Sequence, residues 1–433
     1  MAKFKQGFML GAATAAHQTE GNNTHSDDWV LERIPHSMFT EPSQDAVDHY
    51  HHYAEDIQYL KDAGLNTYRF SIEWARIEPE RGRFDETEVK HYQDVIACCK
   101  NLGIEPIVTL HHFTSPAWLI SEGGWENPDT VERFGEYVSY IMPRIGKDLH
   151  YICTINEANM RLQIGTLMRD IMKRMQEGGD TGSELHKVQV GMNTAGNMQL
   201  SALEGAQAFG LKDPRAVANF VSPGTEAGDL IVMKAHRKAV EIIKRSYPDM
   251  QVGLTLSLHD FQAYPGGEQQ VEQEWDEEFL HYLPYIQDDD FVGLQNYTRK
   301  CFDATGCVTA HDAKAFTQMG YEDYPQAIGN VIRKVAETFH HDLIVTENGI
   351  GTADDEQRQK FLEIATDGVK ACMDDGIPVK GYCCWSLLDN YEWQQGFRPT
   401  FGLIAVDREH DMKRTPKKSL YLLGSMLEHG ETK

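Results

Sequence analysis

One short segment, Ile344-Val345-Thr346-Glu347-Asn348-Gly349, has the pattern of a buried strand that ends in a polar turn. Its apolar, β-branched residues predict a strand over Leu343–Thr346, and the Glu-Asn-Gly that follows is typical of a turn. The pattern therefore places a carboxylate directly at the end of a strand. Comparable short apolar runs recur along the chain, and their number decides the fold.

Eight such runs, with amphipathic stretches between them, predict repeated strand–helix units around a parallel sheet. Eight units form a single (β/α)8 TIM barrel of the α/β class, with its active site at the C-terminal ends of the strands. Because no internal repeat or low-complexity linker interrupts the pattern, we expect one barrel domain over residues 1–433. The predicted strands are Gly7–Thr14, Thr67–Ile72, Glu105–Leu110, Tyr151–Ile155, Gln251–Leu256, Phe291–Leu294, Leu343–Thr346 and Val379–Trp385.

The intervening stretches carry apolar residues at helical spacing. The clearest predicted helices are Val47–Ala63, Glu86–Leu102, Thr130–Gly146, Asp229–Arg245 and Asp355–Asp374. The connection from residue 159 to residue 228 is unusually long, and we predict two helices in it, Arg161–Gln176 and Asn193–Phe209, with a glycine-rich loop at 178–183. We therefore expect long strand-to-helix loops at the catalytic face of the barrel.

The composition favours a soluble globular enzyme, with 41% hydrophobic and 25% charged residues. A net charge of −25 opposes binding to nucleic acid or to an anionic membrane, because both require a basic surface. The opening residues have too short an apolar run for a signal peptide, and no stretch is apolar enough for a membrane span. We therefore expect a cytoplasmic protein whose partner is a small-molecule substrate; the sequence leaves its oligomeric state open.

A second glutamate, Glu157, follows the predicted strand Tyr151–Ile155 and lies 190 positions before Glu347, so only a closed fold brings the two together. Retaining hydrolysis of a glycosidic bond needs such a pair: one carboxylic acid protonates the leaving oxygen, and one carboxylate attacks the anomeric carbon. Either glutamate alone could simply cap a strand or a helix. Two of them at apolar strand ends favour catalysis.

Several separated motifs, in family order, make the chain resemble glycoside hydrolase family 1, the β-glucosidase family. The segment TENG at 346–349 matches the nucleophile motif, and INEA at 155–158 stands where the family normally has Asn-Glu-Pro. The resemblance implies that Glu347 is the nucleophile and Glu157 the acid/base, and that Asn156 contacts the sugar 2-hydroxyl.

Two further motifs resemble family segments beside the nucleophile. RFSIEWARI at 69–77 implies that Arg69 lies close to Glu347, where a guanidinium would keep the carboxylate ionised. DFVGLQNYT at 290–298 has Gln-Asn in place of the commoner Asn-Tyr, yet Tyr297 still falls where a phenol would hydrogen-bond the nucleophile. Arg69 could equally form a structural ion pair, and the two roles are compatible.

Sugar-binding residues are implied by three segments, FMLGAATAAHQTEG at 8–21, LHHFTSPAWL at 110–119 and GYCCWSLLDNYEWQQGF at 381–397 followed by FGL at 401–403. Aromatic faces beside amides and a carboxylate suit a pyranose, because CH groups stack while hydroxyls form hydrogen bonds. A metal on His111 and His112 is not favoured, since neighbours on a strand point to opposite faces. The substrate-binding residues implied are Gln18, His112, Trp385, Glu392, Trp393 and Phe401.

Two other functions fit the sequence less well. A non-catalytic sugar-binding barrel would typically lack one catalytic carboxylate, and both are present here. Phospho-β-glycosidases of the same family carry serine in place of Glu392, whose charge would repel a phosphate. We therefore expect a retaining β-glucosidase that needs no metal or organic cofactor; glucose is not distinguished from galactose or fucose.

Overall fold

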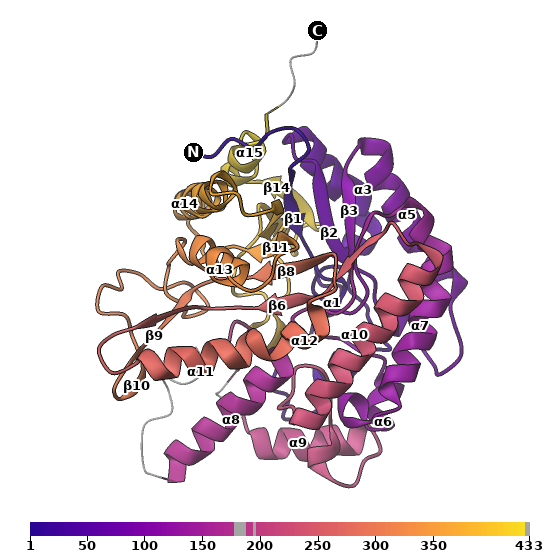
Figure 1. Cartoon of the computed structure of the whole chain (residues 1–433). Helices are drawn as coiled ribbons and strands as arrows, with labels where there is room; N and C mark the ends of the chain where they lie inside the picture. Colours follow the sequence, from indigo (N-terminus) through magenta and orange to yellow (C-terminus); the bar gives the residue numbers. More distant parts are fainter. Residues whose placement is uncertain (177–187, 194–195, 429–433) are drawn as a thin grey trace.

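A computed structural model describes residues 1–176, 188–193 and 196–428. Its centre is a barrel of parallel strands, in the order β5-β4-β3-β2-β1-β12-β11-β8-β6, with helices outside (Figure 1). This architecture is the predicted TIM barrel. The strands are β1 (Met9–Ala13), β2 (Thr67–Ser71), β3 (Glu105–Thr109), β4 (Tyr151–Cys153), β5 (Gln251–Gly253), β6 (Thr255–Ser257), β8 (Phe291–Gln295), β11 (Asp342–Asn348) and β12 (Val379–Trp385).

The barrel closes through its fifth predicted strand, which is broken into β5 and β6 at Leu254. β5 pairs with β4, whereas β6 pairs with β8. At the break, the backbone N–H of Thr154 donates to the carbonyl of Gly253, and that of Gly293 donates to the carbonyl of Leu254, each at 2.9 Å. The nine segments are therefore eight strands, as predicted.

Successive side chains of each strand point alternately into the barrel and toward the outer helices, so the apolar residues form two separate layers. On β12, Cys383 belongs to the cluster inside the barrel, while its neighbours Tyr382 and Cys384 pack against the surrounding helices. On β2, Arg69 is fully buried between Tyr68 and Phe70, which face the helices. A charged residue inside the barrel must have buried partners, and these lie at the C-terminal ends of the strands.

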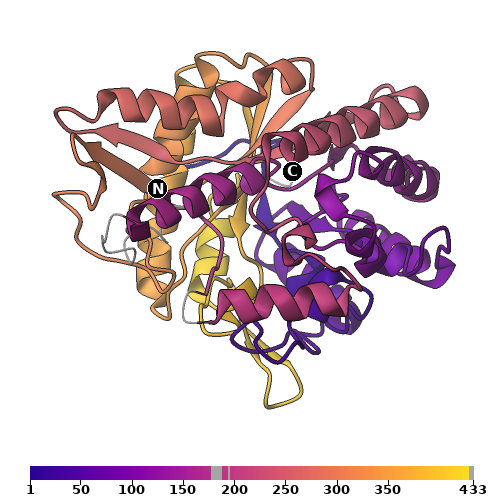
Figure 2. The same cartoon turned by 90° about the horizontal axis from the view of Figure 1, so that it is seen from below.

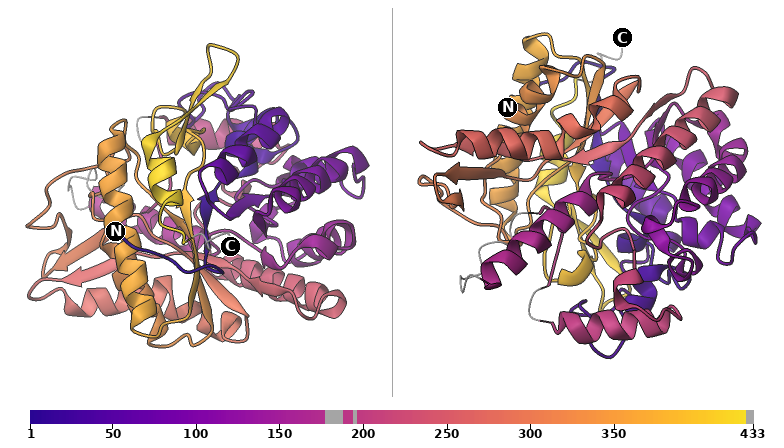
Figure 3. Two further views of the ribbon diagram at one scale, coloured as in Figure 1. Left: turned by 90° about the horizontal axis from the view of Figure 1, so that it is seen from above. Right: turned by 60° about the horizontal axis from the view of Figure 1, so that its bottom comes forward.

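The outer helices begin at side-chain caps. Asp85 accepts hydrogen bonds from the backbone of Thr87 and Glu88 at the start of α5, and Asp354 caps α14 in the same way. Both helices have the predicted bounds. The longer outer helices, shown from two sides in Figure 3, are α3 (His49–Asp62), α5 (Glu86–Leu102), α7 (Thr130–Ile145), α10 (Glu226–Ser246), α13 (Ala327–Ala336) and α14 (Asp355–Asp374).

The long connection contains α8 (Met160–Gln176) and α9 (Met198–Ala208), close to the two predicted helices. Both lie across one end of the barrel in Figure 2. Contacts show that this end carries the C-terminal ends of the strands: the backbone N–H of Gln394 donates to the carbonyl of Gly191, and the side chain of Gln189 accepts from the N–H of Tyr297, just after β8. The glycine-rich run at 178–183 lies outside the described residues.

Smaller elements complete the fold. A three-stranded sheet of β7 (Asp260–Ala263), β9 (Arg299–Asp303) and β10 (Gly306–Val308) was not predicted; it extends beyond β6 and β8. β13 (Ile404–Asp407) and β14 (Lys413–Pro416) form a hairpin. The remaining helices are α1 (Ala16–Thr19), α2 (Asp27–Leu31), α4 (Trp74–Ile77), α6 (Ala117–Ser121), α11 (Glu268–Glu278), α12 (Leu283–Ile286) and α15 (Lys418–Gly424), with 3-10 turns η1 (Gly124–Glu126), η2 (Gly146–Asp148), η4 (Pro214–Ala216), η5 (Leu280–Tyr282) and η6 (Trp393–Gln395). Within the described ranges, every helix is too short or too polar to cross a bilayer.

Candidate active site

The predicted site residues converge on one cavity at the C-terminal ends of the barrel strands. Counting its open mouth, the cavity contains about 340 Å³ of empty space. Arg69 lies beneath it and contacts Glu347. The other ten predicted residues line it: Gln18, His112, Asn156, Glu157, Tyr297, Glu347, Trp385, Glu392, Trp393 and Phe401.

Glu347, near the end of β11, accepts three hydrogen bonds. Arg69 Nη1 lies 2.6 Å and Gln295 Nε2 lies 2.9 Å from its Oε1, and the Tyr297 hydroxyl donates to its Oε2 at 2.5 Å. Two of these donors, Arg69 and Tyr297, occupy the positions that the sequence predicted. Both carboxylate oxygens are therefore held in place, and the adjacent positive charge favours the ionised form.

Asn156 links the two glutamates to the same network. Its Oδ1 accepts from Arg69 Nη2 at 2.6 Å, from Gln295 Nε2 at 2.7 Å and from the Thr255 hydroxyl at 3.1 Å. Because three donors surround the oxygen, the amide nitrogen must point the other way, where it lies 3.2 Å from His112 Nε2. The network thus fixes the orientation of an amide that borders the cavity.

Glu157 is carried by a turn that is tied down on both sides. The N–H of Glu157 donates to the Thr255 hydroxyl at 2.8 Å, and the N–H of Ala158 donates to the Thr255 carbonyl at 2.9 Å. The alanine that replaces the usual proline therefore still occupies an anchored turn. The Glu157 side chain is buried.

The two glutamates have different electrostatic surroundings. Burial, reinforced by the charge of Glu347, raises the pKa of Glu157 well above its ordinary value, although Arg69 opposes the shift. Burial also raises the pKa of Glu347, but there Arg69 and Tyr297 both stabilise the carboxylate directly. One proton shared by this pair therefore resides on Glu157, which gives one acid and one carboxylate in a single cavity.

The opposite wall of the cavity combines aromatic rings with a third carboxyl group. Gln18 Nε2 donates to the Tyr391 carbonyl at 2.8 Å and lies 3.4 Å from Glu392 Oε2. Burial, together with the charge of Glu347, raises the pKa of Glu392 to about 8. The His112 ring stacks on Trp385 with 5.8 Å between ring centroids. Amide, carboxyl and aromatic groups thus meet as a pyranose site requires.

The two neighbouring histidines point in different directions, although both lie beyond the end of β3 at Thr109. His111 Nε2 lies 3.0 Å from the Ser115 hydroxyl, whereas His112 faces Asn156. Across residues 1–176, 188–193 and 196–428, no group of three or more His, Cys, Asp or Glu side chains could hold a metal ion.

Some residues of the site are not predicted from the sequence. Gln295, which donates to Glu347, departs from the family motif, although its place at the end of β8 is the same signal that identifies Glu347. Gln189 accepts from the backbone N–H of Tyr297 at 2.6 Å, and nothing in its local sequence indicates this role. Tyr321 is buried in the cavity wall, and its hydroxyl has no partner in the part of the chain that the structure describes.

Comparisons with known proteins agree on one family. The family model for glycosyl hydrolase family 1 matches residues 1–171 and 285–432. A β-glucosidase from Agrobacterium sp. is 29% identical, with 96% of this chain and 94% of that protein covered. Beta-glucosidase A from Thermotoga maritima is 27% identical, with 99% of this chain and 98% of that protein covered.

Solved structures give the same result. The crystal structure of the β-glycosidase BGL167 matches with a TM-score of 0.86 and 42% identity, over 98% of this chain and 96% of that one. The apo structure of the β-glucosidase 1317 matches with a TM-score of 0.85 and 36% identity, over 97% of this chain and 98% of that one. The interval 172–284, which the family model leaves out, contains most of the atypical connection.

Proposed function

The chain belongs to glycosyl hydrolase family 1, and we propose that this β-glycosidase releases terminal, non-reducing β-D-glucosyl residues with retention of configuration. The observation that carries the proposal is the unequal pair of glutamates in one cavity. Glu347 is held by Arg69, Gln295 and Tyr297, while Glu157 has a strongly raised pKa. Relatives of similar length named as β-glucosidases support glucose as the glycone.

The proposed reaction is a double displacement. In the first step, Glu347 attacks the anomeric carbon, while protonated Glu157 gives its proton to the leaving oxygen. In the second step, the Glu157 carboxylate removes a proton from water, and the water oxygen displaces Glu347 from the anomeric carbon. Each step inverts the anomeric centre, so the sugar leaves with its β configuration. The two carboxyl groups should lie about 5–5.5 Å apart, as retaining enzymes require.

Recognition of the sugar falls to the remaining cavity residues. We assign the 4- and 6-hydroxyls to Glu392 and Gln18, a stacking face to Trp385, an indole N–H donor to Trp393, and a closing aromatic wall to Phe401. Asn156 presents its amide nitrogen to the cavity and is assigned to the 2-hydroxyl, where hydrogen bonds strengthen in the transition state.

A phospho-β-glycoside substrate is disfavoured by the charges in the cavity. None of the described residues that line it is lysine or arginine, and Glu392 contributes a carboxyl group. A phosphate there would be buried without a counter-ion, which costs several kcal/mol. A neutral glycone fits this wall better. The expected cytoplasmic location and the assignment of residues 1–433 to one domain stay predictions.

The order in which product anomers form tests the proposal. We expect ¹H NMR during hydrolysis of 4-nitrophenyl β-D-glucopyranoside to show β-glucose first, followed by slow mutarotation. If α-glucose appeared first, an inverting mechanism would replace the double displacement. A binding barrel without catalysis would give no turnover of this substrate at any pH.

A further inference from the structure

The backbone on both sides of Phe401 is held by charged side chains that lie outside the barrel. Phe401 is buried and lines the cavity wall, directly between Thr400 and Gly402. Its position is set by its backbone and by its ring contacts, so the contacts of its two neighbours are informative.

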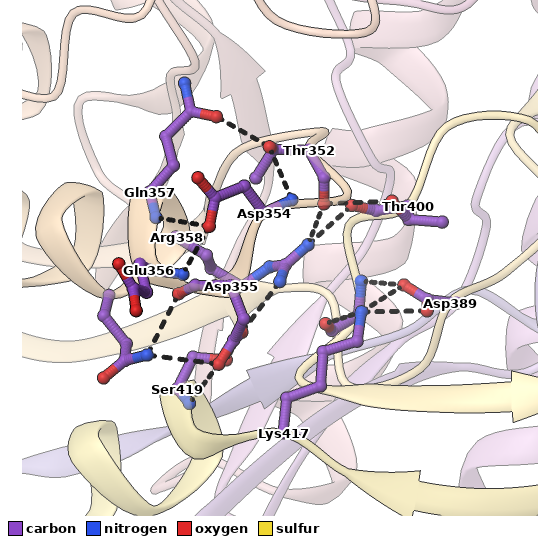
Figure 4. A network of polar contacts seen from close by, with 12 residues as sticks. Thr352, Asp354, Asp355, Glu356, Gln357, Arg358, Asp389, Thr400, Lys417 and Ser419 are labelled. Atoms are coloured by element: carbon purple, nitrogen blue, oxygen red, sulfur yellow. Dashed lines mark hydrogen bonds and ion pairs between the residues drawn. The ribbon is translucent and has the colours of Figure 1, made fainter.

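Arg358, in the first turn of α14, holds the N-terminal side of this segment. Its guanidinium donates to the carbonyl of Thr400 at 2.8 Å and also to the carbonyl of Thr352, in the loop that follows the Glu347 strand (Figure 4). The same two loops also bond directly, because the N–H of Thr352 donates to the Thr400 carbonyl at 3.0 Å. Arg358 is 1% exposed, and Asp355 accepts a hydrogen bond from it at 2.8 Å.

Lys417, immediately before α15, holds the C-terminal side. Its ammonium group donates to the carbonyl of Gly402 at 2.8 Å and to both carboxylate oxygens of Asp389 at 2.9 and 2.8 Å. Asp389 in turn accepts from the N–H of Gly402 at 2.8 Å. A side chain at position 402 would overlap the backbone of Asp389, so only glycine allows this close approach. Figure 4 shows Lys417 directed at Asp389.

The ring of Phe401 transmits this placement to the nucleophile. It packs edge-on against Tyr297, with 6.0 Å between ring centroids and 81° between ring planes. The Tyr297 hydroxyl is the donor that lies 2.5 Å from Glu347 Oε2. If Phe401 moved by a fraction of its ring width, Tyr297 would lose the packing that keeps its hydroxyl in line with the carboxylate.

We propose that Arg358 and Lys417 are positioning residues, which brace Phe401 from outside the barrel and thereby keep Tyr297 hydrogen-bonded to Glu347. Neither cation lines the cavity, and both hold the Thr400–Gly402 segment, while Arg358 also holds the loop of Thr352. The inference rests on the proposed role of Glu347 as nucleophile. It adds to that role a reason why two charges outside the barrel wall, the buried Arg358 and the half-buried Lys417, affect the chemical step.

Lys417→Met and Arg358→Met test the proposed positioning role, and Arg358→Lys serves as a conservative variant. We expect kcat/KM on 4-nitrophenyl β-D-glucopyranoside to fall about 10- to 100-fold in both methionine variants, the scale of a small misplacement of catalytic groups. Arg358→Lys should recover part of the loss. Because Tyr297 would donate less well to Glu347, the pKa of Glu347 should rise, and the acidic limb of the kcat/KM profile should move to higher pH.

A control variant tests whether the loss of any lysine charge on the barrel has the same effect. Lys380 pairs with Asp342 at 3.4 Å at the opposite end of the barrel, so Lys380→Met removes a similar charge without reaching Phe401. It should leave kcat/KM and the pH profile unchanged. All values refer to the folded fraction, measured by circular dichroism and thermal unfolding.

A double-mutant cycle identifies the route of the effect. In a Tyr297→Phe background the hydroxyl is already absent, so Lys417→Met should no longer move the acidic limb. The proposal is wrong if Lys417→Met lowers only the melting temperature. It is also wrong if Lys417→Met moves the acidic limb of the kcat/KM profile equally in the wild-type and Tyr297→Phe backgrounds. A wild-type enzyme without turnover would instead refute the proposed function itself.

Discussion

Arg69→Met is the substitution whose consequence follows most directly from the contacts at the nucleophile. Arg69 is fully buried and donates at 2.6 Å to both Glu347 and Asn156. Methionine fills much of the same space but provides neither the charge nor the donors. The Glu347 carboxylate would then be buried without its cation.

Removing one partner of a buried ion pair costs about 3–5 kcal/mol. If the whole loss is added to the activation free energy, kcat/KM should decrease about 10²- to 10⁴-fold, since each step of about 1.4 kcal/mol changes a rate tenfold. Arg69 stabilises the ionised form of Glu347, so its removal raises the pKa of Glu347. Activity should therefore recover partly as the pH rises, because the nucleophile regains its charge but not its orientation.

The assay is kcat/KM on 4-nitrophenyl β-D-glucopyranoside across a range of pH. Arg414→Met is the matched control: Arg414 is also buried and pairs with Asp56 at 2.9 and 3.0 Å, but its partner lies outside the barrel. The control should destabilise the fold and leave the kcat/KM of the folded fraction within about twofold. An Arg69→Met enzyme within tenfold of wild type, with an unmoved acidic limb, would refute the reasoning.

Three further predictions follow from the same site. Glu347→Gly should abolish hydrolysis. Glu157→Ala should retain the first step on substrates with good leaving groups, and added azide should increase its turnover, because azide needs no general base. If azide instead restored activity to Glu347→Gly and gave a β-product, the roles of the two glutamates would have to be exchanged. Glu347→Gln should lower the pKa of Glu157, because the neighbouring negative charge is gone, and a direct titration of Glu157 by NMR without downward movement would contradict the coupling. Glu392→Ser should reduce the ratio of kcat/KM for a β-glucoside over its 6-phospho analogue, and an unchanged ratio would mean that Glu392 does not face the 6-position.

The elements that sequence predicts best are those whose ends carry their own signal. α5 and α14 have the predicted bounds because Asp85 and Asp354 cap them and apolar spacing continues to their last turns. The break at Leu254 gives no such signal, since an apolar residue continues an apolar run. The break lies where the pairing changes from one neighbour to the next, with β5 beside β4 and β6 beside β8.

The candidate site divides in the same way. Residues that end a barrel strand, such as Glu347 and Tyr297, could be placed from the strand pattern and the family resemblance together. Gln189 could not, because its contact with Tyr297 depends on how the long connection after β4 folds across the barrel. The contacts of Arg358 and Lys417 with the segment around Phe401 could not be predicted either, because both cations donate to backbone carbonyls that any residue provides.

The central claim, that Glu347 forms a covalent glycosyl-enzyme and Glu157 does not, is tested most directly by trapping the intermediate. A 2-deoxy-2-fluoro-β-D-glucosyl fluoride reacts in the first step and slows the second, so that the sugar stays bound. After proteolysis and tandem mass spectrometry, we predict one fluoroglucosyl group per chain, on Glu347. A label on Glu157, or inactivation without any covalent label, would contradict the account.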